Sequence, residues 1–229
     1  VYEPATGLTT LATSRVSRAG ADQRRGRAGR TGPGICIRLW NAGQTAALEP
    51  FDTPEILAAD LSGLLLDLAA WGVTDPKAMS FLDPPPVPAW AEAKALLTRL
   101  DAIDASGQLT PAGKALSRLP LHPRLAHMIV AAAADGDALT AAELAVLIGE
   151  RGLGGDDADL ARRLERFRTD RSTRAEEARS LARRWAKEAG GTDRGDISPG
   201  HHLARAFTDR VAQPAGPRGR FRLANGRQA

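Results

Sequence analysis

The sequence predicts a mostly α-helical protein with a small α/β portion at its start. Apolar residues recur at helical spacings through most of the chain after Pro54, and strand-like sequence is confined to its two ends. The 229 residues include 43% hydrophobic and 25% charged side chains, which is typical of a globular protein and excludes a disordered chain. The single cysteine, Cys36, excludes a disulfide framework and a cysteine-based zinc site.

Nothing in the sequence indicates a membrane or an export signal. No segment approaches the roughly 18 apolar residues of a membrane span, and residues 1–30 contain no apolar run typical of a signal peptide. We therefore expect a soluble cytoplasmic protein with no membrane partner.

Charge is distributed unevenly along the chain. The net charge is +5 over residues 1–40, −8 over 41–150 and +7 over 151–229. This pattern predicts that the two ends face polyanions such as nucleic acid or nucleotide, although a solvated charged surface would give the same pattern. Of the 18 basic residues after position 150, 17 are arginine, whose planar side chain suits phosphate, but high-GC codon usage would produce the same bias.

The first 40 residues are typical of strands and turns around one short helix. The run Ile35–Trp40, entered through Gly32-Pro33-Gly34, predicts a buried strand that includes Cys36. Forty residues are too few for a stable α/β domain, and the chain begins at Val1 without a methionine. We therefore expect this segment to be the last part of a larger domain.

Two amphipathic helices are predicted next. One apolar stripe runs from Ile56 to Trp71 and ends at Gly72, a typical C-terminal cap. After a proline-rich connector, a second stripe runs from Trp90 to Ile103. The tryptophans on these stripes, and Trp185 further on, favour core packing over the stacking of nucleic-acid bases.

A short strand and a third helix follow. Gln108–Leu109 is strand-like, and Thr110 with Pro111 is typical of an N-cap and first helical residue, so a helix is expected over about 110–118. Two helices, a short strand and a third helix match the core of a winged-helix domain. They match a plain helical bundle equally well.

The stretch 123–189 predicts a helical bundle. The sequence Thr140-Ala-Ala-Glu143 is typical of a capping box, a further helix is expected to begin near Asp157, and the last opens at Thr173. Beyond the bundle, the sequence predicts a short helix over 201–212 and a strand over 220–223 that ends in an Asn225-Gly226 turn.

The stretch Gln23–Arg30 is the best candidate for a chemical role. Arg24, Arg27 and Arg30 recur every third residue, so in a helix they would lie near one another and bind one anion, such as a terminal phosphate. Gln23 supplies a neutral donor and acceptor that can orient a water molecule. The alternative for an isolated run of this kind is a generic basic patch.

The longer pattern from Ser17 to Gly34, followed by the predicted strand, resembles motif VI of the DEAH-box RNA helicases, which belong to superfamily two. The similarity extends to Leu109–Lys114 and Leu119–Ala126. Within the family, Ala69–Gly72 and Asp209–Ala212 resemble the bacterial HrpB-type helicases. The resemblance covers essentially the whole chain.

This resemblance implies a role for each matching residue. Gln23 is expected to contact the γ-phosphate of ATP or the attacking water, Arg27 and Arg30 to act as arginine fingers, and Arg24 to hold the motif in place. ATP with Mg²⁺ is expected to be held mainly by a first RecA-like domain that this chain lacks. RNA-backbone contact is expected from part of the arginine run that includes Arg162, Arg163 and Arg166.

The resemblance also implies a domain order. It is the C-terminal part of the second RecA-like domain (1–50), a winged-helix domain (51–122), a helical ratchet domain (123–200) and the start of a β-containing C-terminal domain (201–229). The chain is thus expected to be an internal or C-terminal-side piece of a helicase. Its expected partners are RNA, with DNA as an open alternative, and the remaining domains of the parent protein.

Two elements that ATP hydrolysis needs are missing from the sequence. No DEAH box occurs, and the nearest match to a P-loop, Gly107–Lys114, has one residue too many and lacks the final hydroxyl. We therefore expect the parent protein to couple ATP hydrolysis to RNA unwinding or remodelling, and this piece alone to be inactive. The alternative is a non-enzymatic winged-helix module that binds nucleic acid.

The histidines favour structural roles. His122 lies between helices beside prolines, and His127 is expected on an exposed helix face. His201 and His202 have no third ligand nearby, so helix capping is expected there and no metal site is predicted.

Overall fold

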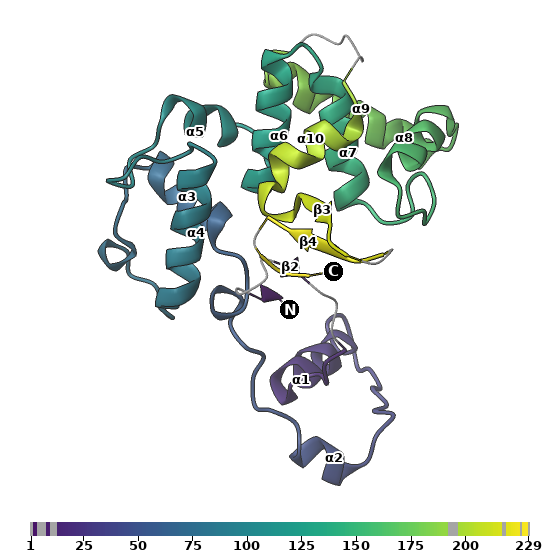
Figure 1. Ribbon diagram of the computed structural model, residues 1–229. Helices are drawn as coiled ribbons and strands as arrows, with labels where there is room; N and C mark the ends of the chain where they lie inside the picture. Colours follow the sequence, from purple (N-terminus) through teal and green to yellow (C-terminus); the bar gives the residue numbers. More distant parts are fainter. Residues whose placement is uncertain are drawn as a thin grey trace. The chain divides into compact units, whose positions relative to one another are not determined.

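The computed structural model describes residues 2–3, 8–9, 13–191, 197–216, 219–224 and 226–228 (Figure 1). Within these residues the protein is mostly helical, as the sequence predicts, and its strands form two small antiparallel pairs. The chain divides into two compact units, residues 1–61 with 75–92 and residues 62–74 with 93–229. None of the described helices is long and apolar enough to cross a bilayer.

The first unit contains short elements. They are β1 (Tyr2–Glu3), β2 (Leu8–Thr9), α1 (Arg18–Arg27), α2 (Ala42–Ala46) and the 3-10 turns η1 (Glu55–Leu57) and η2 (Pro76–Ala78). Helix α4 (Val87–Arg99) begins in this unit and ends in the second.

Side-chain caps define where α1 and α2 begin. The Oγ atom of Ser17 accepts a hydrogen bond from the backbone N–H of Gly20 at 2.9 Å, and Asn41 forms a reciprocal capping box with Gln44. The start of α1 is also held by backbone bonds to Glu49 and Pro50. Only a few apolar side chains, such as that of Ala21, are buried in this unit.

The predicted buried strand Ile35–Trp40 is wrong for this chain. The segment is extended but pairs with no strand among the described residues, and Ile35, Ile37 and Leu39 are 90%, 79% and 92% exposed. Cys36 is exposed as well. A strand is buried only when neighbouring strands satisfy its backbone and a layer covers its side chains, and the described part of this chain supplies neither.

The helix predicted from Ile56 to Trp71 is broken into η1, which belongs to the first unit, and α3 (Ser62–Ala70), which belongs to the second. The backbone leaves helical geometry at Ala58, where φ is −127° and ψ is −9°. Leu57 lies in η1 and is exposed, and Trp71, which was expected in the core, follows the last residue of α3 and is 75% exposed. Gly72 ends α3 with a φ of +82°, in agreement with its predicted cap.

The third helix is present, and the predicted short strand is reduced to a single bridge. Leu109 forms an isolated antiparallel bridge with Ile103. Helix α5 (Pro111–Leu116) begins with Thr110 as its N-cap, whose Oγ1 accepts from the N–H of Gly113 at 2.9 Å. Gly113 fits tightly, because a Cβ at this position would lie 2.0 Å from the carbonyl oxygen of Ala102.

The rest of the second unit is a helical bundle (Figure 1). Helix α7 packs on α9 and α6, and α10 packs on α6. Alanines occupy many of the buried positions between these helices, which allows their axes to approach closely. The helices are α6 (Pro123–Ala134), α7 (Ala138–Gly149), α8 (Leu160–Thr169), α9 (Thr173–Glu188) and α10 (Pro199–Ala206).

The predicted capping box Thr140–Glu143 is wrong. Helix α7 begins at Ala138, three residues earlier than a cap at Thr140 would allow, and follows Asp137. Both predicted box residues instead bind Arg168 of α8, whose Nε donates to Glu143 at 2.7 Å and whose Nη2 donates to Thr140 at 3.0 Å. A long-range charged partner therefore replaces the local pairing.

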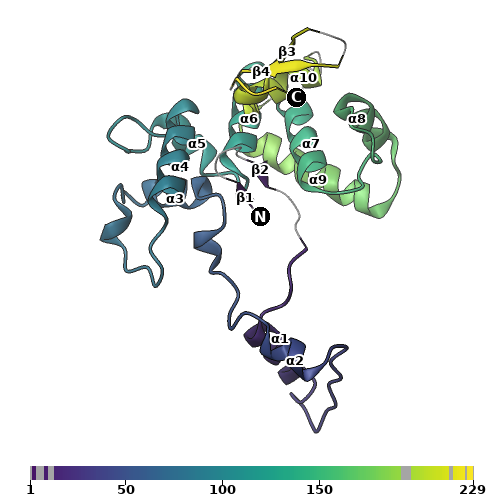
Figure 2. The same cartoon turned by 60° about the horizontal axis from the view of Figure 1, so that its bottom comes forward.

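The C-terminal part of the unit begins with η3 (Thr208–Arg210) and a hairpin of β3 (Ala212–Pro214) and β4 (Phe221–Leu223), which Figure 2 shows beside α10. The guanidinium of Arg124, almost fully buried, donates to Asp209 at 2.6 Å and to the carbonyl of Ala206 at 3.0 Å. The predicted strand 220–223 is present, and Asn225 of the predicted turn lies outside the described residues.

Candidate functional site

Helix α1 carries most of the candidate phosphate-binding stretch. Gln23 and Arg27 are four residues apart, so they lie on one face of the helix. Successive residues turn by about 100°, which places this face on the side away from Ala21, the buried residue of α1. Arg24 lies about 60° from Ala21 and so flanks the buried side.

Of the three arginines expected to bind one anion, Arg24 and Arg27 lie within α1 and Arg30 does not. Helix α1 ends at Arg27, where the N–H of Ala28 bonds to the carbonyl of Arg25 at 3.1 Å, and Arg30 lies in the following turn. The helix therefore brings Gln23 and Arg27 together by its register. The position of Arg30 depends instead on how the chain leaves the helix.

The cluster is open and electrostatically uncompensated. Gln23, Arg24, Arg27 and Arg30 are all exposed, and within the described part of the chain no hydrogen bond or ion pair involves their side chains. A Cβ added at Gly26, on the same side of α1, would meet nothing within 4 Å. An anion bound to another protein surface can therefore reach this face. The alternative, a generic basic patch, predicts the same exposure.

The three α8 arginines predicted to bind RNA differ in availability. Arg163 is turned inward, and its guanidinium donates to the carbonyl oxygens of Leu147 at 2.9 Å and Leu153 at 3.1 and 3.2 Å. Arg162 and Arg166 have side chains 69% and 58% exposed, with only longer ion pairs of 3.6 to 3.9 Å to Asp157 and Asp159. The guanidinium groups of Arg162 and Arg166 are therefore more available to an external phosphate than that of Arg163.

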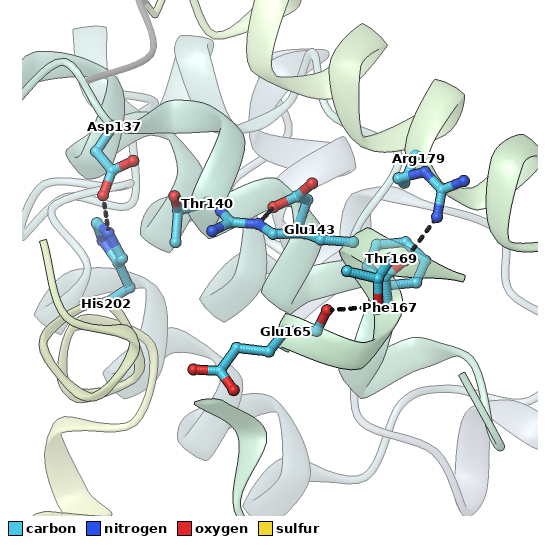
Figure 3. A network of polar contacts seen from close by, with 9 residues as sticks. Asp137, Thr140, Glu143, Glu165, Phe167, Thr169, Arg179 and His202 are labelled. Carbon is cyan, nitrogen blue, oxygen red and sulfur yellow. Dashed lines mark hydrogen bonds and ion pairs between the residues drawn. The ribbon is translucent and has the colours of Figure 1, made fainter. Parts of the chain in front are cut away.

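The bundle contains polar contacts that no pattern in the sequence predicts (Figure 3). Nε2 of His202 lies 2.8 Å from Oδ2 of Asp137, and neither side chain is more than 1% exposed. On the other side of α7, the guanidinium of Arg179 donates to the carbonyl of Phe167 at 2.6 Å. His202 lies inside α10, so its predicted capping role is wrong. No sequence signal pairs residues 65 positions apart.

His122 is the N-cap of α6, and His127 lies within this helix. His122 caps this helix through Nδ1, which accepts from the N–H of Arg124 at 3.2 Å, in agreement with a structural role. The prediction that His127 lies on an exposed helix face is wrong, because its side chain is half-buried; burial is the main cause that lowers its pKa from 6.5. Among the residues that the structure describes, no group of three histidine, cysteine or carboxylate side chains is placed to hold a metal ion.

The stretch Gly107–Lys114 has no phosphate-binding geometry. Its second half forms the first turn of α5, and Gly113 packs against the backbone of Ala102. A P-loop needs backbone N–H groups that face an open cradle, whereas the N–H of Gly113 is taken by its own cap.

Comparison with known proteins gives consistent matches. Residues 95–121 match the winged-helix helicase-associated domain family, HA2. The chain is 41% identical over 226 residues to the ATP-dependent RNA helicase HrpB of Escherichia coli, which covers 98% of this chain and 27% of that protein. It is 38% identical over 129 residues to the human probable ATP-dependent RNA helicase DHX34, across 56% of this chain and 11% of that protein.

A solved structure agrees with the sequence matches. The crystal structure of the Escherichia coli DEAH/RHA helicase HrpB superposes with a TM-score of 0.78 and 39% identity, over 100% of this chain and 28% of that chain. The present chain thus spans a little over a quarter of the length of these relatives.

Proposed function

Because the chain belongs to the DEAH-box RNA helicase family and is similar to its HrpB-type members over nearly its whole length, we propose that it is the part of an ATP-dependent RNA helicase that completes the ATP site and handles RNA. The parent activity in this proposal is the coupling of ATP hydrolysis to RNA unwinding or remodelling in the cytoplasm. This piece alone is inactive, since it contains neither a P-loop nor a DEAH box.

The observation that carries the proposal is the open, uncompensated face of α1. Gln23 and Arg27 share this face, and Arg30 follows in the next turn. Guanidinium groups directed at a transferring phosphoryl group stabilise the negative charge that spreads over its oxygens in the transition state. We assign this role to Arg27 and Arg30, the positioning of the attacking water to Gln23, and a supporting role to Arg24 near the buried side.

The proposed domain order follows the family. Residues 1–50 are assigned to the second RecA-like domain, 51–122 to the winged-helix domain, 123–200 to the ratchet domain and 201–229 to the start of the C-terminal domain. Alternating exposed residues Ile35, Ile37 and Leu39 support the first assignment, because such a row is typical of a strand whose sheet is completed by other chain segments. The match over 95–121 supports the second.

RNA contact is assigned to the exposed arginines of α8. Arg162 and Arg166 point outward with weak ion pairs that a phosphate can replace. Arg163 is left out of this assignment because its Nε and Nη2 donate to carbonyl oxygens within the bundle.

Mg²⁺ fits the described residues poorly. Mg²⁺ prefers several oxygen ligands in octahedral geometry, and the carboxylate on α1, that of Asp22, is paired with Arg38. Ligands for the metal that accompanies ATP must therefore come from outside the described residues, and this chain supplies cationic side chains to the phosphates.

The test is ATP turnover by the complete protein that carries this segment. Arg27→Ala and Arg30→Ala should each lower kcat by about 10³-fold or more while the protein remains folded. Arg25→Ala, which removes an arginine from the same helix but from another face, is the matched control and should change kcat by less than about threefold. If ATP turnover by the complete protein survives both Arg27→Ala and Arg30→Ala, this segment does not take part in catalysis. Its remaining candidate role is then non-enzymatic binding of RNA.

A further inference from the structure

The extended segment after α1 crosses the end of that helix at very short range. A Cβ at Gly34 would lie 1.8 Å from the carbonyl oxygen of Ala28 and 2.5 Å from its carbonyl carbon. The backbone cannot yield to such an overlap as a flexible side chain can, so this contact exists only with glycine at position 34. Ala28 is the C-cap of α1 and lies between Arg27 and Arg30.

The same segment contacts α1 a second time, nearer the middle of the helix. The guanidinium of Arg38, four residues after Gly34, forms an ion pair with the carboxylate of Asp22. Asp22 immediately precedes Gln23. The alternation of an extended chain places Arg38 on the side that faces α1 and the exposed Ile37 and Leu39 on the other.

We propose that Gly34 and the Asp22–Arg38 ion pair are positioning residues that hold α1 and the turn after it so that Arg27 and Arg30 are aimed at the ATP phosphates. The inference rests on the function proposed above and adds three residues to its machinery. None of the three touches the phosphate itself.

The start of α1 is held by the backbone bonds to Glu49 and Pro50, and the contacts at Asp22 and Ala28 hold the rest of the helix. Together they fix the direction of the side chains between Asp22 and Ala28, which include Gln23 and Arg27. The Gly34 contact also sets how the chain leaves α1, and the position of Arg30 depends on that path. Catalytic side chains must be placed accurately, because a misplacement of about 1 Å can lower the reaction rate about 10²-fold.

A purely stabilising role for these contacts makes a different prediction. It would lower the fraction of folded protein and so lower nucleotide binding and turnover together. A positioning role acts on the transition state, so binding of ADP should be kept while binding of the transition-state analogue ADP–aluminium fluoride is lost.

The first experiment uses two glycines of the same loop in the complete protein. Gly34→Ala should lower kcat about 10²-fold and weaken ADP–aluminium fluoride binding by a similar factor, with ADP affinity within about threefold of the parent. Gly32→Ala is the matched control, since a Cβ there would meet nothing within 4 Å, and it should behave like the parent. Equal kcat values for the two variants would overturn the proposal.

The ion pair gives a second test that does not require Gly34→Ala to fold. Asp22→Arg and Arg38→Asp should each lower kcat, by less than Gly34→Ala because the pair is partly exposed. The double variant, which restores opposite charges in exchanged positions, should recover at least half of the lost rate. A double variant no better than the single variants would count against the role of the pair.

The arginine variants separate the two proposals. If Arg27→Ala and Arg30→Ala leave turnover intact, the proposed function itself fails. If they abolish turnover while Gly34→Ala and the ion-pair variants do not affect it, only the positioning role fails.

Discussion

Nε2 of His202 on α10 lies 2.8 Å from Oδ2 of Asp137, the residue before α7, and the two side chains are almost completely inaccessible to solvent. The remaining polar atoms, Oδ1 of Asp137 and Nδ1 of His202, have no partner among the described residues. Asp137 does not cap its own helix. Its carboxylate instead ties α10 to the α6–α7 junction, where Arg205 and Asp135 form a further ion pair at 2.5 Å.

Replacing His202 should therefore destabilise the bundle strongly. His202→Ala leaves a buried oxygen of Asp137 without its hydrogen-bond partner, which costs about 1–3 kcal/mol in the free energy of unfolding. His201→Ala removes the same residue type from the exposed side of α10 and should change the free energy by less than about 0.5 kcal/mol. Urea denaturation of the three proteins measures both values, and similar values for the two variants would contradict the role of the buried pair.

Arg162 and Arg163 are adjacent in sequence but should respond differently to truncation. Arg163→Ala removes hydrogen bonds to the carbonyls of Leu147 and Leu153, so unfolding should become easier by about 2 kcal/mol with little change in RNA affinity. Arg162→Ala should leave stability nearly unchanged and reduce the salt dependence of RNA binding by about one unit of slope. Chemical denaturation and RNA titration over a range of salt concentrations measure these effects, and the opposite assignment would show that Arg163 faces RNA.

Two helical glycines should give effects of opposite sign when changed to alanine. At Gly113 a Cβ would lie 2.0 Å from the carbonyl oxygen of Ala102, so Gly113→Ala must displace α5 and should destabilise the protein by about 2 kcal/mol. At Gly63, near the start of α3, a Cβ would meet nothing within 4 Å, so Gly63→Ala should stabilise by about 0.5 kcal/mol through helix propensity. Thermal unfolding distinguishes the two, and a neutral Gly113→Ala would contradict the close contact.

His127 should make stability depend on pH below neutrality. Burial lowers the pKa of His127 in the folded protein from 6.5, and the positive charge of Arg205 lowers it further. A hydrogen bond to the backbone of Arg205 and the negative charge of Asp101 act in the opposite direction but do not outweigh burial. Between the lowered pKa and 6.5 the unfolded chain binds more protons, so stability is kept above pH 6.5 and falls as the pH drops through this window.

The variant His127→Gln removes this titration. Urea unfolding between pH 7.5 and 5 should show a smaller loss of stability for the variant than for the parent. The same loss in both proteins would show that His127 is not responsible.

Local sequence determined much about this protein. The mostly helical fold, the Thr110 cap with Pro111, the Gly72 terminus and the strand-like Leu109 follow from interactions within a few residues, and the structure contains each of them. The DEAH-box motif pattern is also a property of the linear sequence, and the comparisons agree with that assignment. The roles of Gln23, Arg27 and Arg30 remain predictions.

Where a local sequence pattern fits more than one structure, contacts with distant parts of the chain decided which structure forms. Thr140 and Glu143 match a capping box, but Arg168 from another helix binds both, because a buried carboxylate needs a charged partner more than a helix needs that cap. Ile35 to Leu39 have the pattern of a buried strand, yet they are exposed, since burial of a strand requires neighbouring strands that the described chain does not provide. Helical and strand patterns specify which face is apolar, whereas contacts between distant residues decide whether that face is covered.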